Sequence, residues 1–205
     1  MKKMKIIIHP TYFPNIFSFK TIINSTNILF EVNDYYVKQT LRNRTSIHAA
    51  NGKLNLSVPV RFSSTKKEKY KDIRICYDSN WQKIHLKSIE TAYKNSPFYD
   101  FFEDYFINFY NKKEKFLVDL NFSSIRLIFE ILEKELNCSF TNEYLEKYVD
   151  LTDYRTLLTN KNFNEKVNFK NYTQVFQEKN GFIENLSSID LIFNKGLDFE
   201  DFIKF

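Results

Sequence analysis

The stretch "MKIIIHPTYFPNIFSFKTIINSTNILFEV", residues 4–32, decides the fold class of this chain. Residues 4–8 are short and rich in isoleucine, and a histidine–proline pair ends them, which is typical of a buried strand. Apolar residues then recur at helical spacing over 16–23, and "NILFEV" has the pattern of a second strand. Because parallel strands need a long crossover connection, this order favours 4–8 and 28–32 as parallel neighbours in an α/β fold.

A β-hairpin is predicted for residues 45–61. "TSIHAA" and "KLNLSVPV" flank Asn51-Gly52, and an Asn-Gly pair between two alternating segments is the strongest short hairpin signal. Apolar residues occupy alternate positions from 54 to 60, so one face of the second strand is expected to be buried. We therefore predict a mixed sheet, built from the N-terminal βαβ unit and this hairpin.

Helical patterns dominate the second half of the chain. "WQKIHLKSIETAYKN", "PFYDFFEDYFINFY" and "SSIRLIFEILEKEL" each carry apolar residues at helical spacing. Residues 137–170 are polar and irregular, with at most one short helix near "NEYLEKYV". With no repeat and no clear linker, we expect a single domain, 1–205, with a helical C-terminal extension over about 97–205.

The composition limits the classes of function. The 22 Phe and 13 Tyr among 205 residues provide for a substantial core, and the 3 Gly leave no glycine-rich phosphate loop. A net charge of +5 fits an anionic small molecule or a nucleic acid such as RNA as partner. Cys76 and Cys138 lack paired spacing, and the apolar start is too short for a signal peptide or membrane span. We expect a soluble cytoplasmic protein; its oligomeric state is left open.

A polar, cationic segment, "DYYVKQTLRNR" at 34–44, lies directly before the hairpin. Its arginines offer forked donors that suit phosphate or carboxylate groups, and its amides and tyrosines add hydrogen bonds and ring surfaces. The candidate substrate-binding residues are Tyr12, Tyr36, Lys38, Gln39, Arg42, Asn43 and Arg44. By spacing alone, these residues suit an RNA contact as well as a nucleotide-sugar site.

Two histidines are candidate catalytic residues. His9 ends the first strand, where α/β proteins commonly place ligands, although it also fits a simple strand end beside a proline. Trp81 and His85 form an i, i+4 pair that could bind a ring and supply a base, or equally could belong to the core. His48, inside a hairpin strand, fits a surface or packing residue. No acidic cluster or cysteine pair accompanies the 3 His, so neither a metal nor another cofactor is expected.

Four ordered blocks together resemble the WbqC-like family, in the form that Bacteroidetes-type bacteria carry. The blocks are "IIHPTYFPN", "DYYVKQTLRNRTSIHAANGKLNLSVPV", "WQKIHLKSIETAYKNSPFYDFFEDYF" and "YTQVFQEKNGFIENLSSIDLIFNKG". The family motifs fall on Pro10, Tyr12, Pro14, Tyr36, Lys38, Gln39, Arg42, Asn43, Arg44, Trp81, His85, Tyr93, Pro97 and Phe98. The sequence departs from the family pattern at Phe13, Val37 and Leu86, the last of which stands where relatives often carry a second aromatic ring.

The resemblance implies an acyl or aminoacyl transferase, because some members have been proposed to transfer glycine to a sugar in O-antigen and other surface polysaccharide biosynthesis. On that reading His85 or His9 would be the base, with Trp81 and Tyr93 beside the substrate. Asn43, Gln39 and Tyr36 would donate to the oxyanion, and Arg42 and Arg44 would clamp a diphosphate or an activated glycyl donor. The alternatives are a non-catalytic protein that binds RNA or another polyanion, and a purely structural protein.

Overall fold

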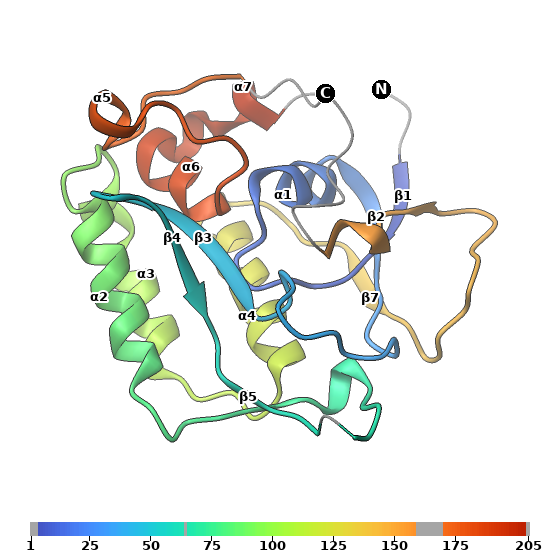
Figure 1. The fold of residues 1–205 in the computed structure, drawn as a ribbon. Coiled ribbons are helices and arrows are strands. Elements are labelled where there is room, and N and C mark those ends of the chain that lie inside the picture. Colours follow the sequence, from blue (N-terminus) through green and yellow to red (C-terminus); the bar gives the residue numbers. More distant parts are fainter. Residues whose placement is uncertain (1–3, 64, 159–169, 204–205) are drawn as a thin grey trace.

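A four-stranded parallel sheet forms the frame of the molecule (Figure 1). The computed structural model describes residues 4–63, 65–158 and 170–203. The strands are β1 (Met4–Ile8), β2 (Ser25–Phe30), β7 (Cys138–Phe140) and β8 (Thr152–Asp153), in the order β7-β2-β1-β8. The parallel pairing of the first two strands, with Ile6 opposite Ile28, confirms the prediction made from residues 4–32.

Helix α1 (Ile16–Ile23) connects the two central strands. Asn15 caps its start, because the side-chain oxygen accepts a hydrogen bond of 2.9 Å from the backbone N–H of Ser18. Helix α4 (Leu117–Ile131) packs against both elements: its Phe122 ring lies 6.0 Å from Phe30 of β2, and its Phe129 ring lies 6.4 Å from Phe19 of α1. The helix and the sheet thus share one aromatic core.

The outer strands of the sheet come from the segment that the sequence pattern marked as irregular. Residues 138–140 and 152–153 pair with β2 and β1, and the segment "NEYLEKYV" between them contains no helix. Strands of two or three residues are too short to show a period of two, so their existence depends on an available partner edge. The prediction of an irregular segment was therefore wrong for these two strands.

The hairpin is confirmed as β3 (Arg44–Ala49) and β4 (Gly52–Ser57). The predicted α/β class, with a βαβ unit, a hairpin and a helical second half, is confirmed; among the described residues the hairpin forms a two-stranded sheet of its own beside the parallel sheet. The C-terminal part of the chain contacts β3 instead: the backbone N–H of Ser187 donates to the carbonyl of Ser46 at 2.8 Å. One face of β4 is buried at Leu56, whereas Leu54 near the hairpin tip is 37% exposed.

The remaining elements cover the hairpin and the sheet. The helices are α2 (Trp81–Tyr93), α3 (Tyr99–Asn111), α5 (Gln177–Asn180), α6 (Ser188–Lys195) and α7 (Glu200–Ile203). The shorter elements are β5 (Val60–Arg61), η1 (Tyr70–Asp72), β6 (Arg74–Ile75), η2 (Arg155–Leu158) and η4 (Gly196–Phe199). In Figure 1 the hairpin runs through the middle, with α2 and α3 on one side and the parallel sheet on the other. The predicted helical second half is confirmed.

The C-terminal segment is part of the same hydrophobic cluster as the βαβ unit. Leu186 accepts a backbone hydrogen bond of 2.8 Å from Ile16, and Ser188 donates one of 2.8 Å to Pro14. Residues 159–169 and 204–205 of the expected extension lie outside the described residues. Within the described part of the chain, no helix is long and apolar enough to cross a membrane.

Candidate functional site

Polar side chains gather where the parallel strands end. His9 follows β1, Glu31 and Asp34 follow β2, and Asp153 and Arg155 lie at the end of β8. The chain passes from β1 to β2 on one side, whereas β8 lies on the other side of β1, so the strand order reverses beside β1. In open parallel sheets, ligands bind at the carboxyl edge at such a reversal.

His9, Asp34 and Arg42 form a compact group at this edge. Nη2 of Arg42 lies 2.6 Å from Nε2 of His9 and donates to Oδ2 of Asp34 at 2.9 Å, while Nε2 and Oδ2 are 3.1 Å apart. Because a guanidinium only donates, we assign Nε2 of His9 as the acceptor from Arg42, which places the proton of the neutral ring on Nδ1. Among the described residues, Nδ1 of His9 has no hydrogen-bond partner and is buried.

The charge states of this group follow from its surroundings. Burial, assisted by the Arg42 charge, lowers the pKa of His9 to about 4, so the imidazole is neutral at pH 7. Burial alone would raise the pKa of Asp34, but the contacts around it, among them the hydrogen bond and the charge of Arg42, hold it down at about 2. The group therefore combines a neutral ring, a carboxylate and a guanidinium.

Arg42, predicted to clamp a diphosphate, has its guanidinium inside the protein. It is 0% exposed, and its other terminal nitrogen, Nη1, donates to the carbonyl of Tyr35 at 2.7 Å. Both terminal nitrogens are therefore engaged inside the protein, and Arg42 positions His9 and Asp34. Arg44, at the start of β3, is half-buried, and its Nε has no partner in the described structure.

Two further side chains fix the segments that carry His9 and Arg42. Asn121 of α4 donates to the carbonyl of Arg42 at 2.6 Å. The hydroxyl of Tyr70 donates to the carbonyl of Pro10 at 2.6 Å, and its ring centroid lies 4.8 Å from the guanidinium carbon of Arg42. These contacts hold the residue after His9 and the backbone of Arg42 in fixed positions.

Glu31 fixes the turn that carries Asp34. It is 0% exposed, and its Oε1 accepts hydrogen bonds from the backbone N–H groups of Asn33 and Asp34, at 2.7 and 3.1 Å, and from the Thr141 hydroxyl at 3.0 Å. Its Oε2 lies 3.7 Å from Nη1 of Arg155. Sequence reasoning missed these residues, although "EVND" directly after a strand is a signal of polar side chains at a sheet edge.

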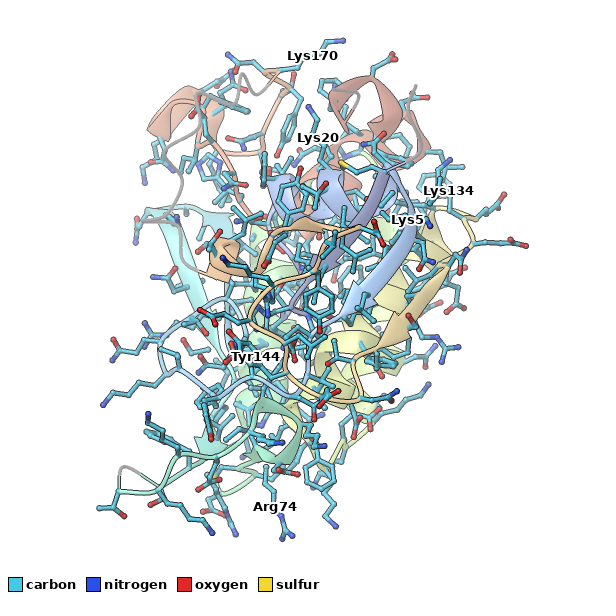
Figure 2. All side chains as sticks on the ribbon, turned by 90° about the vertical axis from the view of Figure 1, so that its right-hand side faces the viewer. Lys5, Lys20, Arg74, Lys134, Tyr144 and Lys170 are labelled. Carbon is cyan, nitrogen blue, oxygen red and sulfur yellow. The ribbon has the colours of Figure 1, made fainter. Side chains whose placement is uncertain are left out.

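Arg155 also organises the loop between β7 and β8. It donates to the carbonyls of Leu145 and Glu146 at 2.7 and 2.8 Å, and its guanidinium carbon lies 5.1 and 5.2 Å from the ring centroids of Tyr144 and Tyr148. Tyr144 marks this loop in Figure 2. A single buried side chain thus connects the loop to the edge that holds His9.

The second predicted histidine lies in an aromatic cluster. Nδ1 of His85 is 3.0 Å from the hydroxyl of Tyr12, which is itself 2.6 Å from the hydroxyl of Tyr110. The ring centroids of Trp81 and His85 are 5.1 Å apart. Burial lowers the pKa of His85 to about 4. Among the described residues, no hydrogen bond or ring contact connects His85 to His9 or Arg42. The two predicted bases therefore belong to separate groups.

Tyr93 is also remote from the carboxyl edge. Its hydroxyl donates to Oδ1 of the buried Asp190 at 2.8 Å and accepts from the backbone N–H of His48 at 3.2 Å. The ring of His48 contacts Oε1 of Gln174 at 3.2 Å. This buried network connects α2, β3 and the C-terminal segment, which fits a structural role for Tyr93.

The other predicted binding residues lie at or near the surface. Lys38 and Gln39 are exposed, and the backbone of Gln39 has a positive φ of 62°. Asn43 is half-buried and donates to the carbonyl of Val58 at 3.2 Å. Tyr36 is half-buried, with its ring centroid 5.9 Å from that of Phe62. The structure therefore distributes the predicted residues over four places: the carboxyl edge, the aromatic cluster around His85, the buried network of Tyr93, and the surface that carries Tyr36, Lys38, Gln39 and Asn43.

The comparisons with known proteins place these residues in a family. The sequence model of the WbqC-like protein family matches residues 9–157, which include His9, Asp34, Arg42 and Arg155. No curated protein and no solved structure matches the chain. Within residues 4–63, 65–158 and 170–203, no group of three or more His, Cys, Asp or Glu side chains is arranged to hold a metal ion.

Proposed function

The chain belongs to the WbqC-like protein family, and on this premise we propose that it is an acyl or aminoacyl transferase that modifies an amino sugar or a nucleotide-sugar for surface polysaccharide. The observation that carries the proposal is the unpartnered, buried Nδ1 of a neutral His9 at the carboxyl edge of the sheet. Because this nitrogen is buried, a substrate carbonyl reaches it only when the segments that cover His9 move aside. A fixed donor there suits a carbonyl whose oxygen becomes negative during the reaction.

His9 is proposed to polarise the carbonyl rather than to act as the base. Because Arg42 donates to Nε2, Nδ1 bears the proton and can only donate while the ring is neutral. A neutral imidazole held in this way is a known electrophilic device. Asp34 and Arg42 keep the ring in place, so its N–H needs no reorganisation when charge develops.

The reaction is balanced without a protein base. The amine nitrogen of the acceptor sugar attacks the carbonyl carbon of the donor, and the oxyanion that forms accepts the hydrogen bond from Nδ1 of His9. The bond to the leaving group then breaks, the carbonyl re-forms, and the departing group takes the proton that the amine loses. His85 is less suited than His9 to donate to the oxyanion, because the hydroxyl of Tyr12 contacts its Nδ1 at 3.0 Å.

The test is a transfer assay with UDP-amino sugars as acceptors and glycyl or acyl thioesters and glycyl-tRNA as donors, with products followed by mass spectrometry. His9→Ala is expected to lower kcat by about 10²–10³-fold, the effect of removing one oxyanion donor, with little change in KM. His85→Gln serves as the comparison variant, and circular dichroism checks both folds. The absence of product with every pair, or an unchanged kcat in His9→Ala, would rule out the proposal.

A further inference from the structure

A cleft of about 440 Å³ lies between the segment 36–38 and the loop residues 62–63 and 65–68. The backbone N–H of Tyr36 donates to the carbonyl of Glu68 at 2.9 Å, so the two segments are held together at the base of the cleft. The sequence pattern gives the loop, "RFSSTKKEKYK", only the composition of a solvated connection. The volume lies within the range of about 300–1,000 Å³ that is usual for small-molecule sites.

The cleft offers ring surfaces. Phe62 is 41% exposed, and its ring is tilted by 59° against the ring of Tyr36. The Nζ atom of Lys38 lies 6.0 Å from the Phe62 centroid. An exposed phenylalanine beside a tyrosine can stack on a planar base, and stacking of this kind tolerates any base.

The cleft is also cationic. Lys38, Lys66 and Lys67 line it, against the one acidic side chain of Glu68. Oε1 of Glu68 accepts the backbone N–H of Ser63 at 3.0 Å, so this carboxylate fixes the loop. The lysine side chains supply positive charges that suit a phosphate or diphosphate group.

Tyr36 connects the cleft to the carboxyl edge of the sheet. Its ring lines the cleft, while its buried hydroxyl has no hydrogen-bond partner among the described residues. Burial raises the pKa of Tyr36 to about 12, although the nearby charges of Arg42 and Arg44 act in the opposite direction. Arg42 contacts His9 and also donates to the carbonyl of Tyr35, the residue before Tyr36, so its guanidinium connects the proposed reaction site to the segment that forms one side of the cleft.

We propose that this cleft binds the nucleoside diphosphate part of the substrate, with the base on Phe62 and Tyr36 and the phosphates on the lysines. This proposal depends on the proposed function for the reaction that follows binding, and it identifies the substrate class as a nucleotide-linked sugar. A small nucleotide is favoured over RNA because the ring surfaces and the lysines gather around one half-open cleft of about 440 Å³, a volume that suits a small molecule.

The experiment measures binding of UDP and ADP to the full chain by isothermal titration calorimetry. The double variant Lys66→Ala/Lys67→Ala is expected to weaken both nucleotides by about tenfold or more, and Phe62→Ala by a similar factor, with Phe62→Tyr restoring affinity. The matched control is Lys53→Ala/Lys71→Ala, which removes the same charge from exposed lysines outside the cleft. The control is expected to retain its affinity within twofold.

Several results would overturn the assignment. These are no binding of either nucleotide, equal losses in the cleft and control variants, and tighter binding of a short RNA through the same lysines. His9→Ala is expected to bind UDP normally. If UDP binds normally but no transfer occurs, the proposed function is ruled out and the cleft assignment stands. If transfer occurs but the cleft variants do not change nucleotide affinity, only the cleft assignment is ruled out.

Discussion

Acid should destabilise this protein well before its carboxylates titrate. His9 and His85 are both buried, and burial lowers the pKa of each from 6.5 to about 4. Below pH 6.5 the unfolded chain therefore binds protons that the folded chain does not bind. The stabilisation that depends on these neutral rings is complete above about pH 6.5 and is lost as the pH falls toward about 4.

The size of the effect follows from the same two pKa values. Between pH 7 and pH 5, each histidine should lower the free energy of unfolding by about 2 kcal/mol, and both together by about 4 kcal/mol. Asp34, with a pKa of about 2 in the folded state, loses its contribution only below about pH 4 and does not act in this window. Asp190, whose pKa burial raises, acts in the opposite direction as its folded form takes up a proton first.

Urea unfolding at about pH 7, 6 and 5, followed by circular dichroism, measures this change. The single variants His9→Gln and His85→Gln should each lose about half of the pH dependence, and the double variant most of it, whatever their stability at pH 7. An unfolding free energy that is equal at pH 7 and pH 5, or a double variant with the wild-type slope, would refute the reasoning.

Two further predictions concern the loop and the C-terminal segment. Arg155→Ala should lower the free energy of unfolding by about 2–3 kcal/mol, because it removes the positive partner of the buried Glu31 carboxylate. In the same variant, trypsin should cleave faster at the exposed Lys147 in the loop between β7 and β8. Unchanged cleavage would show that the loop does not depend on Arg155. Gly196→Ala should cost about 1–3 kcal/mol more than Gly181→Ala in thermal unfolding, because an added Cβ at Gly196 would lie 2.6 Å from the Phe98 ring, whereas Gly181 has open space. Equal losses would mean that Phe98 moves aside freely.

Local sequence signals determined the central part of the fold. The βαβ unit and the hairpin were predictable because the strand period, the helical period and the Asn-Gly turn are properties of neighbouring residues. The position of His9 at a strand end was equally visible, and so was the cationic character of the segment before the hairpin. These features depend on the backbone and on composition, and need no knowledge of distant partners.

Only the tertiary structure decided how those side chains are used. Arg42 became a buried partner of His9 and Asp34, residues that lie 33 and 8 positions away in the chain. His85 was directed to the hydroxyl of Tyr12, 73 positions away, and so into an aromatic cluster. The residue type determines which hydrogen bonds a side chain can donate or accept. The partner of that side chain depends on which segments the packing brings within about 3 Å of it.

The sheet edges and the cleft have the same origin. Strands β7 and β8 formed because β2 and β1 offered unpaired edges to short segments that have no strand pattern of their own. The loop residues 62–63 and 65–68 became one wall of a cleft when the carbonyl of Glu68 bonded to the backbone of Tyr36. The sequence alone determined which elements could form and which chemistry was present, whereas long-range pairing decided where that chemistry meets, because a contact between distant residues leaves no periodic trace in the chain.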